Sequence, residues 1–258
     1  MQTANFSHPG CYARELRDCS QKLSREHYVS ASVLRLLGEE HTVSNARWLP
    51  PGQHSPPLCV GDLGSRILCE RHNSVLSSLD ASAEVFFAEL LRALSEPVHG
   101  TSPQRVSADG DLLELWVLKA CCGAIASGSL IDDGNTLVRD LPRAWLNILF
   151  SRTPWEEGTG LHIGQAPMTP YRGYEMGPMY LDQSRTLGGG GIEFAGVLLF
   201  VLLESGVEKR IIEQSTGQVI PLIYRPGAIT IESPKQKTEI ELRWPTWVPT
   251  ERVLYCRA

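Results

Sequence analysis

The sequence lacks any apolar run long enough to cross a bilayer, since its longest, FAGVLLFVLL at 194–203, falls well short. The opening MQTANFSHPG lacks a basic segment followed by an apolar one, so we expect no signal peptide. The seven cysteines are an odd count, which disfavours a disulfide framework in a chain without an export signal. These absences predict a cytoplasmic protein with no membrane partner, whose thiols are buried or bind metal.

The chain also lacks an excess of basic residues. Its net charge of −5 argues against a protein that coats nucleic acid, but not against an enzyme with a local basic groove. The GGGG run at 188–191 is not followed by a helix carrying Lys-Ser/Thr, which excludes a phosphate-binding loop of that type. Apolar and charged contents of 42% and 21% are ordinary for a globular protein of one large or several small domains.

The pattern of residues divides the chain into three parts. Residues 1–80 hold four of the cysteines, residues 81–154 have helical periodicity, and residues 155–258 contain short β-prone runs separated by Gly and Pro. Three helices are expected: one from a cap at Asp80 to about Ser95, one over 109–128 and one over 140–151. The expected fold class is α+β, with a C-terminal domain that is mostly antiparallel sheet.

The N-terminal part carries a pattern of metal ligands. Cys69 and His72 have the Cys-x2-His spacing that one turn offers to a tetrahedral zinc, and Cys11 and Cys19 complete a Cys3His set. His8 or Cys59 is an alternative to Cys19 as the fourth ligand. A small module needs such a metal cross-link because its own hydrophobic core is small. The Pro- and Gly-rich segment 48–65 is expected to be a loop or insertion within it.

The runs KLSREHYVS and LCERHNSVLSSLD, together with these ligands, resemble the HNH endonucleases, also called ββα-metal or His-Me finger nucleases, and a group of uncharacterised bacterial proteins of that type. The resemblance covers about residues 11–80. It implies a treble-clef zinc module and three catalytic roles. By this resemblance, Glu26 is expected to be the acidic ligand of a catalytic Mg²⁺ or Mn²⁺, His27 the general base, and Asn73 the metal ligand from the helix.

The chemistry of these residue types agrees with phosphodiester hydrolysis. A neutral imidazole can take the proton of the attacking water, and a hard divalent ion prefers carboxylate and amide oxygens. Neighbours on a regular strand point to opposite sides, so Glu26 and His27 can serve one site only from a bulged or twisted hairpin. The expected substrate is DNA, or else RNA, and Arg66 and Arg71 are candidates for contacts with its phosphates.

The sequence departs from the family pattern in several places. The first cysteine pair is Cys-x7-Cys rather than Cys-x2-Cys, and the acidic position is Glu rather than the commoner Asp. The middle Asn has no secure match, and Asn45 is the candidate. Two rival interpretations therefore stay open: a non-catalytic zinc-finger module that serves binding or scaffolding, and an α+β enzyme whose site lies in the β-rich half.

Overall fold

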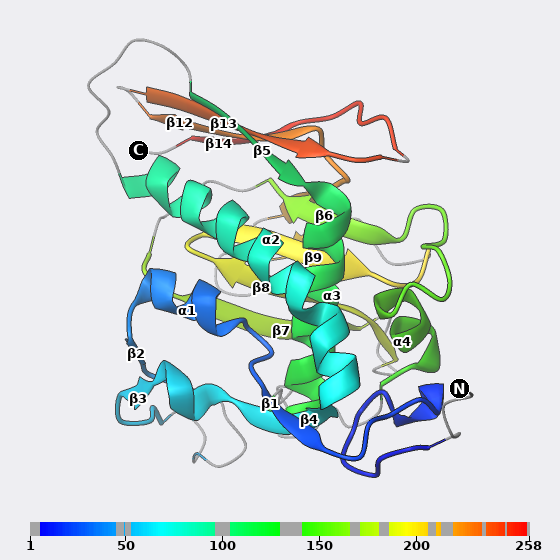
Figure 1. Ribbon diagram of the computed structural model, residues 1–258. Coiled ribbons are helices and arrows are strands. Elements are labelled where there is room, and N and C mark those ends of the chain that lie inside the picture. Colours follow the sequence, from blue (N-terminus) through cyan, green and yellow to red (C-terminus); the bar gives the residue numbers. More distant parts are fainter. Residues whose placement is uncertain are drawn as a thin grey trace. The chain divides into compact units, whose positions relative to one another are not determined.

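The computed structural model describes residues 6–44, 49, 53–95, 104–129, 141–165, 171–180, 186–205, 210–212, 219–233, 236–245 and 247–256. This part of the chain is α+β, with helices and several sheets (Figure 1). Two compact units divide the chain, Met1–Ala81 with Leu118–Pro154 and Ser82–Val117 with Trp155–Ala258. The helical segment 81–154 is thus shared between the units. Among the described residues, no helix has the length and hydrophobicity that crossing a bilayer requires.

The first unit contains two antiparallel strands that come from distant parts of the sequence. Strand β1 (Leu23–Glu26) pairs with β4 (Ser65–Cys69), with Leu23 opposite Cys69. The register shifts between Ser24 and Glu26, where a bulge re-aims the side chains that follow. Strand β4 leads directly into helix α2 (Glu70–Ser95), as Figure 1 shows. The order of these elements is therefore strand, strand, helix.

The chain between β1 and β4 forms short elements, which are helix α1 (Ala31–Leu37), strands β2 (Glu40–His41) and β3 (Leu58–Cys59) and the 3-10 helix η2 (Val60–Leu63). A further 3-10 helix, η1 (Arg14–Leu16), precedes β1. The segment 48–65, expected as a loop or insertion, contains β3 and η2. Asn45 lies outside the described residues.

Helix α2 begins at Glu70, so the cap predicted at Asp80 is wrong. The Asp80 carboxylate lies within the helix and accepts hydrogen bonds from Ser30 and Lys119 instead of from the N–H groups of a helix start. The apolar face of α2 follows the expected three- and four-residue spacing. It buries Leu76, Leu79, Ala83, Phe86, Phe87 and Leu90.

Both ends of helix α3 (Gly110–Ser127) agree with the sequence. Asp109 Oδ1 accepts the Leu112 N–H at 3.0 Å, and Gly128 follows with a φ of 71°, which favours glycine. Helix α4 (Arg143–Leu149) follows Pro142 and is shorter than the expected 140–151. It stops because the chain turns at Ser151, whose φ is 54°.

The larger sheet of the second unit is antiparallel throughout, in the order β10-β11-β6-β9-β8-β7. Its strands are β6 (Gly160–Gly164), β7 (Tyr174–Tyr180), β8 (Leu187–Phe194), β9 (Val197–Leu202), β10 (Arg210–Ile212) and β11 (Val219–Tyr224). The glycine run lies inside β8, where a Cβ at Gly189 would come within 2.2 Å of the Val201 carbonyl oxygen. Glycine therefore lets β8 approach β9 closely.

The smaller sheet has the order β14-β12-β13-β5 and mixed pairing. Its strands are β5 (Gln104–Asp109), β12 (Ala228–Ser233), β13 (Gln236–Arg243) and β14 (Val253–Cys256). β12 and β13 are antiparallel, whereas β14 and β5 join them in parallel. Strand β5 was not expected, because it is a short, largely polar run whose pairing partner lies far along the chain. The expectation of mostly antiparallel pairing describes the larger sheet best.

Candidate functional site

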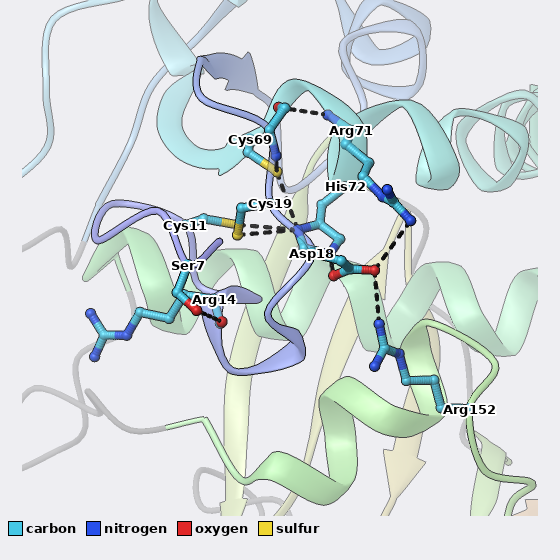
Figure 2. A network of polar contacts seen from close by, with 10 residues as sticks. Ser7, Cys11, Arg14, Asp18, Cys19, Cys69, Arg71, His72 and Arg152 are labelled. Carbon is cyan, nitrogen blue, oxygen red and sulfur yellow. Dashed lines mark hydrogen bonds and ion pairs between the residues drawn. The ribbon is translucent and has the colours of Figure 1, made fainter. Parts of the chain in front are cut away.

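Four residues expected to bind zinc come together in a buried cluster (Figure 2). The donor atoms of Cys11, Cys19, Cys69 and His72 all lie within 4.8 Å of one another. His72 Nδ1 is 3.4 Å from Cys11 Sγ, 3.9 Å from Cys19 Sγ and 3.2 Å from Cys69 Sγ. Tetrahedral zinc with bonds of about 2.0 Å to N and 2.3 Å to S needs ligand atoms about 3.5–4 Å apart. The cluster has nearly that size.

Backbone hydrogen bonds bring the two halves of the cluster together. The Tyr12 N–H donates to the Ile67 carbonyl at 2.9 Å, which holds the segment after Cys11 against β4. The Glu70 N–H donates to the Lys22 carbonyl at 2.9 Å, and the Ser20 N–H points to Cys69 Sγ at 3.4 Å. These bonds fix the start of α2 against the cysteine segment. Cys69 ends β4, and His72 lies in the first turn of α2.

The far side of His72 is held by a carboxylate that the sequence did not single out. Because Nδ1 faces the three sulfurs, Nε2 carries the proton and donates to Asp18 Oδ1 at 2.9 Å. Asp18 Oδ2 in turn contacts Arg152 at 3.0 Å and Arg71 at 3.3 Å, as Figure 2 shows. A carboxylate behind a histidine ligand is a common second layer of zinc sites. Nothing in the sequence distinguishes Asp18 from other acidic residues.

The donor set itself fits zinc. Three thiols and an imidazole are the soft and borderline ligands of a closed structural site. Burial raises the pKa of the Cys11 thiol to about 12, so this thiol needs a bound cation to ionise near neutral pH. Of the two alternatives to Cys19, the His8 ring accepts the Gly10 N–H and Cys59 is exposed, and neither belongs to the cluster.

A separate open pocket of about 450 Å³ lies in the same unit, at the end of β1 and the starts of α1 and α2. All three residues expected to be catalytic, Glu26, His27 and Asn73, line it. Arg25, Ser30 and Asp80 also line it, and the sequence did not suggest them for a site. The bulge in β1 precedes Glu26, which agrees with the condition set from the sequence for two neighbours to face one place.

The ring of His27 is oriented by the backbone. Its Nε2 lies 3.0 Å from the Val60 carbonyl oxygen, which can only accept a hydrogen bond. Nε2 therefore carries the proton, and Nδ1 is the basic nitrogen of the neutral ring. Burial lowers the pKa of His27, the Val60 carbonyl opposes this shift, and the charges of Arg25 and Lys119 lower the pKa further. His27 is thus neutral at physiological pH.

Glu26 is bound to a lysine that the sequence did not suggest for a site. Its Oε1 lies 2.6 Å from Nζ of Lys119, a residue of α3, and its side chain is 5% exposed. Nζ also lies 2.6 Å from Asp80 Oδ1 and donates to the His27 carbonyl at 3.3 Å. Burial raises the pKa of Glu26, and the Lys119 charge opposes this. The sequence feature that could have identified Lys119 is its position as a single lysine inside the apolar run LWVLKACC.

These contacts do not fit the expected Mg²⁺ or Mn²⁺ on Glu26 and Asn73. The Glu26 oxygen would have to lose its contact with the Lys119 ammonium at 2.6 Å before it could bind a metal ion. Asp80, the other carboxylate that lines the pocket, bonds to the same ammonium. Neither expected phosphate-contacting arginine lines the pocket, because Arg71 pairs with Asp18 and Arg66 is an exposed residue of β4. Arg25 is the arginine at the pocket.

Comparisons of the chain with models of protein families, with curated proteins and with solved structures found no match.

Proposed function

We propose that residues 11–80 form a treble-clef zinc module of the ββα-metal type, and that the neighbouring pocket hydrolyses phosphodiester bonds of nucleic acid. Support for the module comes from the order of its parts. Cys11 and Cys19 precede β1, β4 pairs with β1, and Cys69 and His72 lie where β4 becomes α2. A zinc ion there would join the N-terminal segment to the base of a helix that lines the pocket.

The observation that carries the proposed activity is the bond between His27 Nε2 and the Val60 carbonyl. It leaves Nδ1 unprotonated in a ring whose pKa burial has lowered, which is the state that a general base needs at neutral pH. A water molecule gives its proton to Nδ1 and attacks phosphorus. The bond from phosphorus to the leaving 3′-oxygen breaks, that oxygen takes a proton from solvent water, and the products end in a 5′-phosphate and a 3′-hydroxyl.

The surrounding charges suit an anionic substrate. Arg25 lines the pocket, and its side chain packs over Gly64, where a Cβ would approach Arg25 Cγ within 2.8 Å. The charges of Arg25, Arg35 and Lys119 all act on His27. Of these three, Arg25 lines the pocket, where a cation can bind a phosphate and stabilise charge that develops on it. No step of this mechanism passes through a divalent ion on Glu26, because that carboxylate is paired with Lys119.

One observation favours a second function, a zinc module that binds a partner without catalysis. The nuclease resemblance assigns the Glu26 carboxylate to metal binding. In the structure this carboxylate pairs with Lys119 instead. In that case the contacts of Glu26, Asp80 and Lys119 serve to join β1, α2 and α3. The two functions differ in what they require of His27.

The test is cleavage of plasmid DNA by zinc-loaded protein, with and without added Mg²⁺, in the wild type and His27→Ala. We expect the wild type to nick the plasmid and His27→Ala to be slower by about 100-fold or more. His41→Ala is the matched control, since His41 Nε2 also lies 3.0 Å from a backbone carbonyl, that of Gly38, but His41 does not line the pocket. Equal cleavage by wild type and His27→Ala would contradict the mechanism. Absence of cleavage by the wild type would favour the binding module.

A further inference from the structure

Lys119 is a buried cation in an apolar helix. Its side chain is 1% exposed, and its neighbours Val117, Leu118, Ala120 and Cys121 are buried as well. An ammonium group loses its hydration at such a position, and only close anions or hydrogen-bond acceptors compensate for that loss. The sequence therefore keeps a lysine where an apolar residue would pack at a lower desolvation cost. Its contacts indicate the reason.

The Lys119 ammonium has three donors and three close acceptors. Glu26 Oε1 and Asp80 Oδ1 each lie 2.6 Å away, and the His27 carbonyl oxygen lies 3.3 Å away. The His27 carbonyl and Asp80 accept hydrogen bonds from the ammonium, and Glu26 pairs with it by charge. Asp80 Oδ1 also accepts a hydrogen bond from Ser30 Oγ, which fixes the carboxylate. Glu26, Asp80, Ser30 and His27 all line the pocket.

The oxygens around Nζ are of the kind that bind a divalent metal ion. Two carboxylate oxygens and a backbone carbonyl oxygen form the kind of hard-oxygen set that Mg²⁺ or Mn²⁺ prefers. In this protein all three oxygens contact the ammonium. A divalent ion on the same oxygens would bind at about 2.1 Å from them and would meet the positive Nζ at short range. The lysine and the ion cannot share this set.

We propose that Lys119 is the fixed cation of the pocket and takes the place of a divalent metal ion at Glu26 and Asp80. The proposal rests on the proposed function, because it concerns the cation of the same pocket, but its main consequence is a binding property. The zinc-loaded wild type takes up no Mn²⁺ at the pocket. Phosphodiester hydrolysis there is independent of added Mg²⁺ or Mn²⁺. Removal of the ammonium leaves two carboxylates that can bind such an ion.

The experiment titrates Mn²⁺ into the zinc-loaded protein, without substrate, and follows the EPR signal of free aqueous Mn²⁺. Mn²⁺ does not displace zinc from a thiolate site, since it prefers oxygen ligands. We expect the wild type and Lys119→Arg to leave the signal unchanged. Lys119→Met lowers it by about one ion per chain, and Asp80→Asn added to Lys119→Met reverses this uptake. Lys22→Met, at an exposed lysine of the same unit, behaves as the wild type.

Uptake of Mn²⁺ by the wild type that Glu26→Gln abolishes would overturn the proposal. A folded Lys119→Met that takes up no Mn²⁺ would overturn it as well. Circular dichroism and zinc content establish whether Lys119→Met folds. If it does not fold, the Mn²⁺ titration of the wild type and Glu26→Gln still tests the proposal. Because no substrate is present, the outcome of the Mn²⁺ titration does not depend on whether the protein cleaves nucleic acid. In the plasmid assay, cleavage that requires Mg²⁺ would contradict Lys119 as the cation while leaving His27 as the base.

Discussion

Asp18, the residue before Cys19, can act on the Cys3His cluster through its contact with His72. The bond from His72 Nε2 fixes the ring so that Nδ1 faces the three sulfurs, and Arg152 and Arg71 hold the carboxylate in turn. We expect Asp18→Ala to weaken zinc binding by about 10- to 100-fold, the usual effect of losing such a partner. Competition with a chromophoric chelator measures this. Asp62→Ala, at an exposed acid in η2, serves as the control, and equal zinc affinity of the two variants would refute the role.

His27 makes the pH dependence of the proposed reaction predictable. Its pKa is lowered from the usual value of about 6.5, chiefly by burial, so the basic form predominates at neutral pH. The rate of cleavage should therefore rise with pH through a value below about 6.5 and stay level above it. A pH profile of initial rates checks this. A rate that still rises through about pH 7.5 would assign the base to another group.

At the scale of elements, α3 packs its backbone directly on the segment after β1. A Cβ at Gly123 would lie 2.4 Å from Cβ of Tyr28 and 3.2 Å from its Cα. Gly123→Ala should lower the free energy of unfolding, because overpacking costs about 1–3 kcal/mol and exceeds the helix-propensity gain of about 1 kcal/mol. Chemical denaturation measures the change. Gly61→Ala, with nothing within 4 Å of the added Cβ, is the control, and a more stable Gly123→Ala would refute this contact.

Local signals predicted three of the helices and the β-rich character of residues 155–258. Asp109 and Gly128 mark the two ends of α3, and apolar spacing gave the buried face of α2. The start of α2 was missed because Asp80 has the composition of a cap but bonds to Ser30 and Lys119. Strand β5 was missed because its pairing with β13 depends on residues far along the chain. Both contacts join residues far apart in the sequence, so the preferences of neighbouring residues do not reveal them.

The residues of the candidate site were also predicted in part and missed in part. Ligand spacing gave Cys11, Cys19, Cys69 and His72, since a tetrahedral zinc imposes a pattern on the sequence. Asp18 and Lys119 were missed, because only the folded chain brings one behind His72 and the other between Glu26 and Asp80. Partners of buried charges depend on tertiary packing and leave no regular spacing.

At the scale of the whole molecule, each unit contains a buried polar centre that joins distant segments. In the second unit, Arg225 binds Glu114 through Nε at 2.9 Å and through a second nitrogen at 2.7 Å, and Glu114 also accepts the Leu161 N–H. This joins α3 to β6 and to the residue that directly follows β11. In the first unit the Cys3His cluster has the corresponding role, because it brings residues of 11–19 next to residues of 69–72.

The central claim is that zinc closes this cluster, and metal analysis of protein purified without chelator tests it most directly. The account predicts about one zinc per chain in the wild type and in Cys59→Ser, whose thiol is exposed and outside the cluster. Cys69→Ser should lose the metal and the ordered structure of the first unit, because zinc binding there is coupled to folding. A folded wild type without zinc, or equal loss of zinc in Cys59→Ser, would contradict the account.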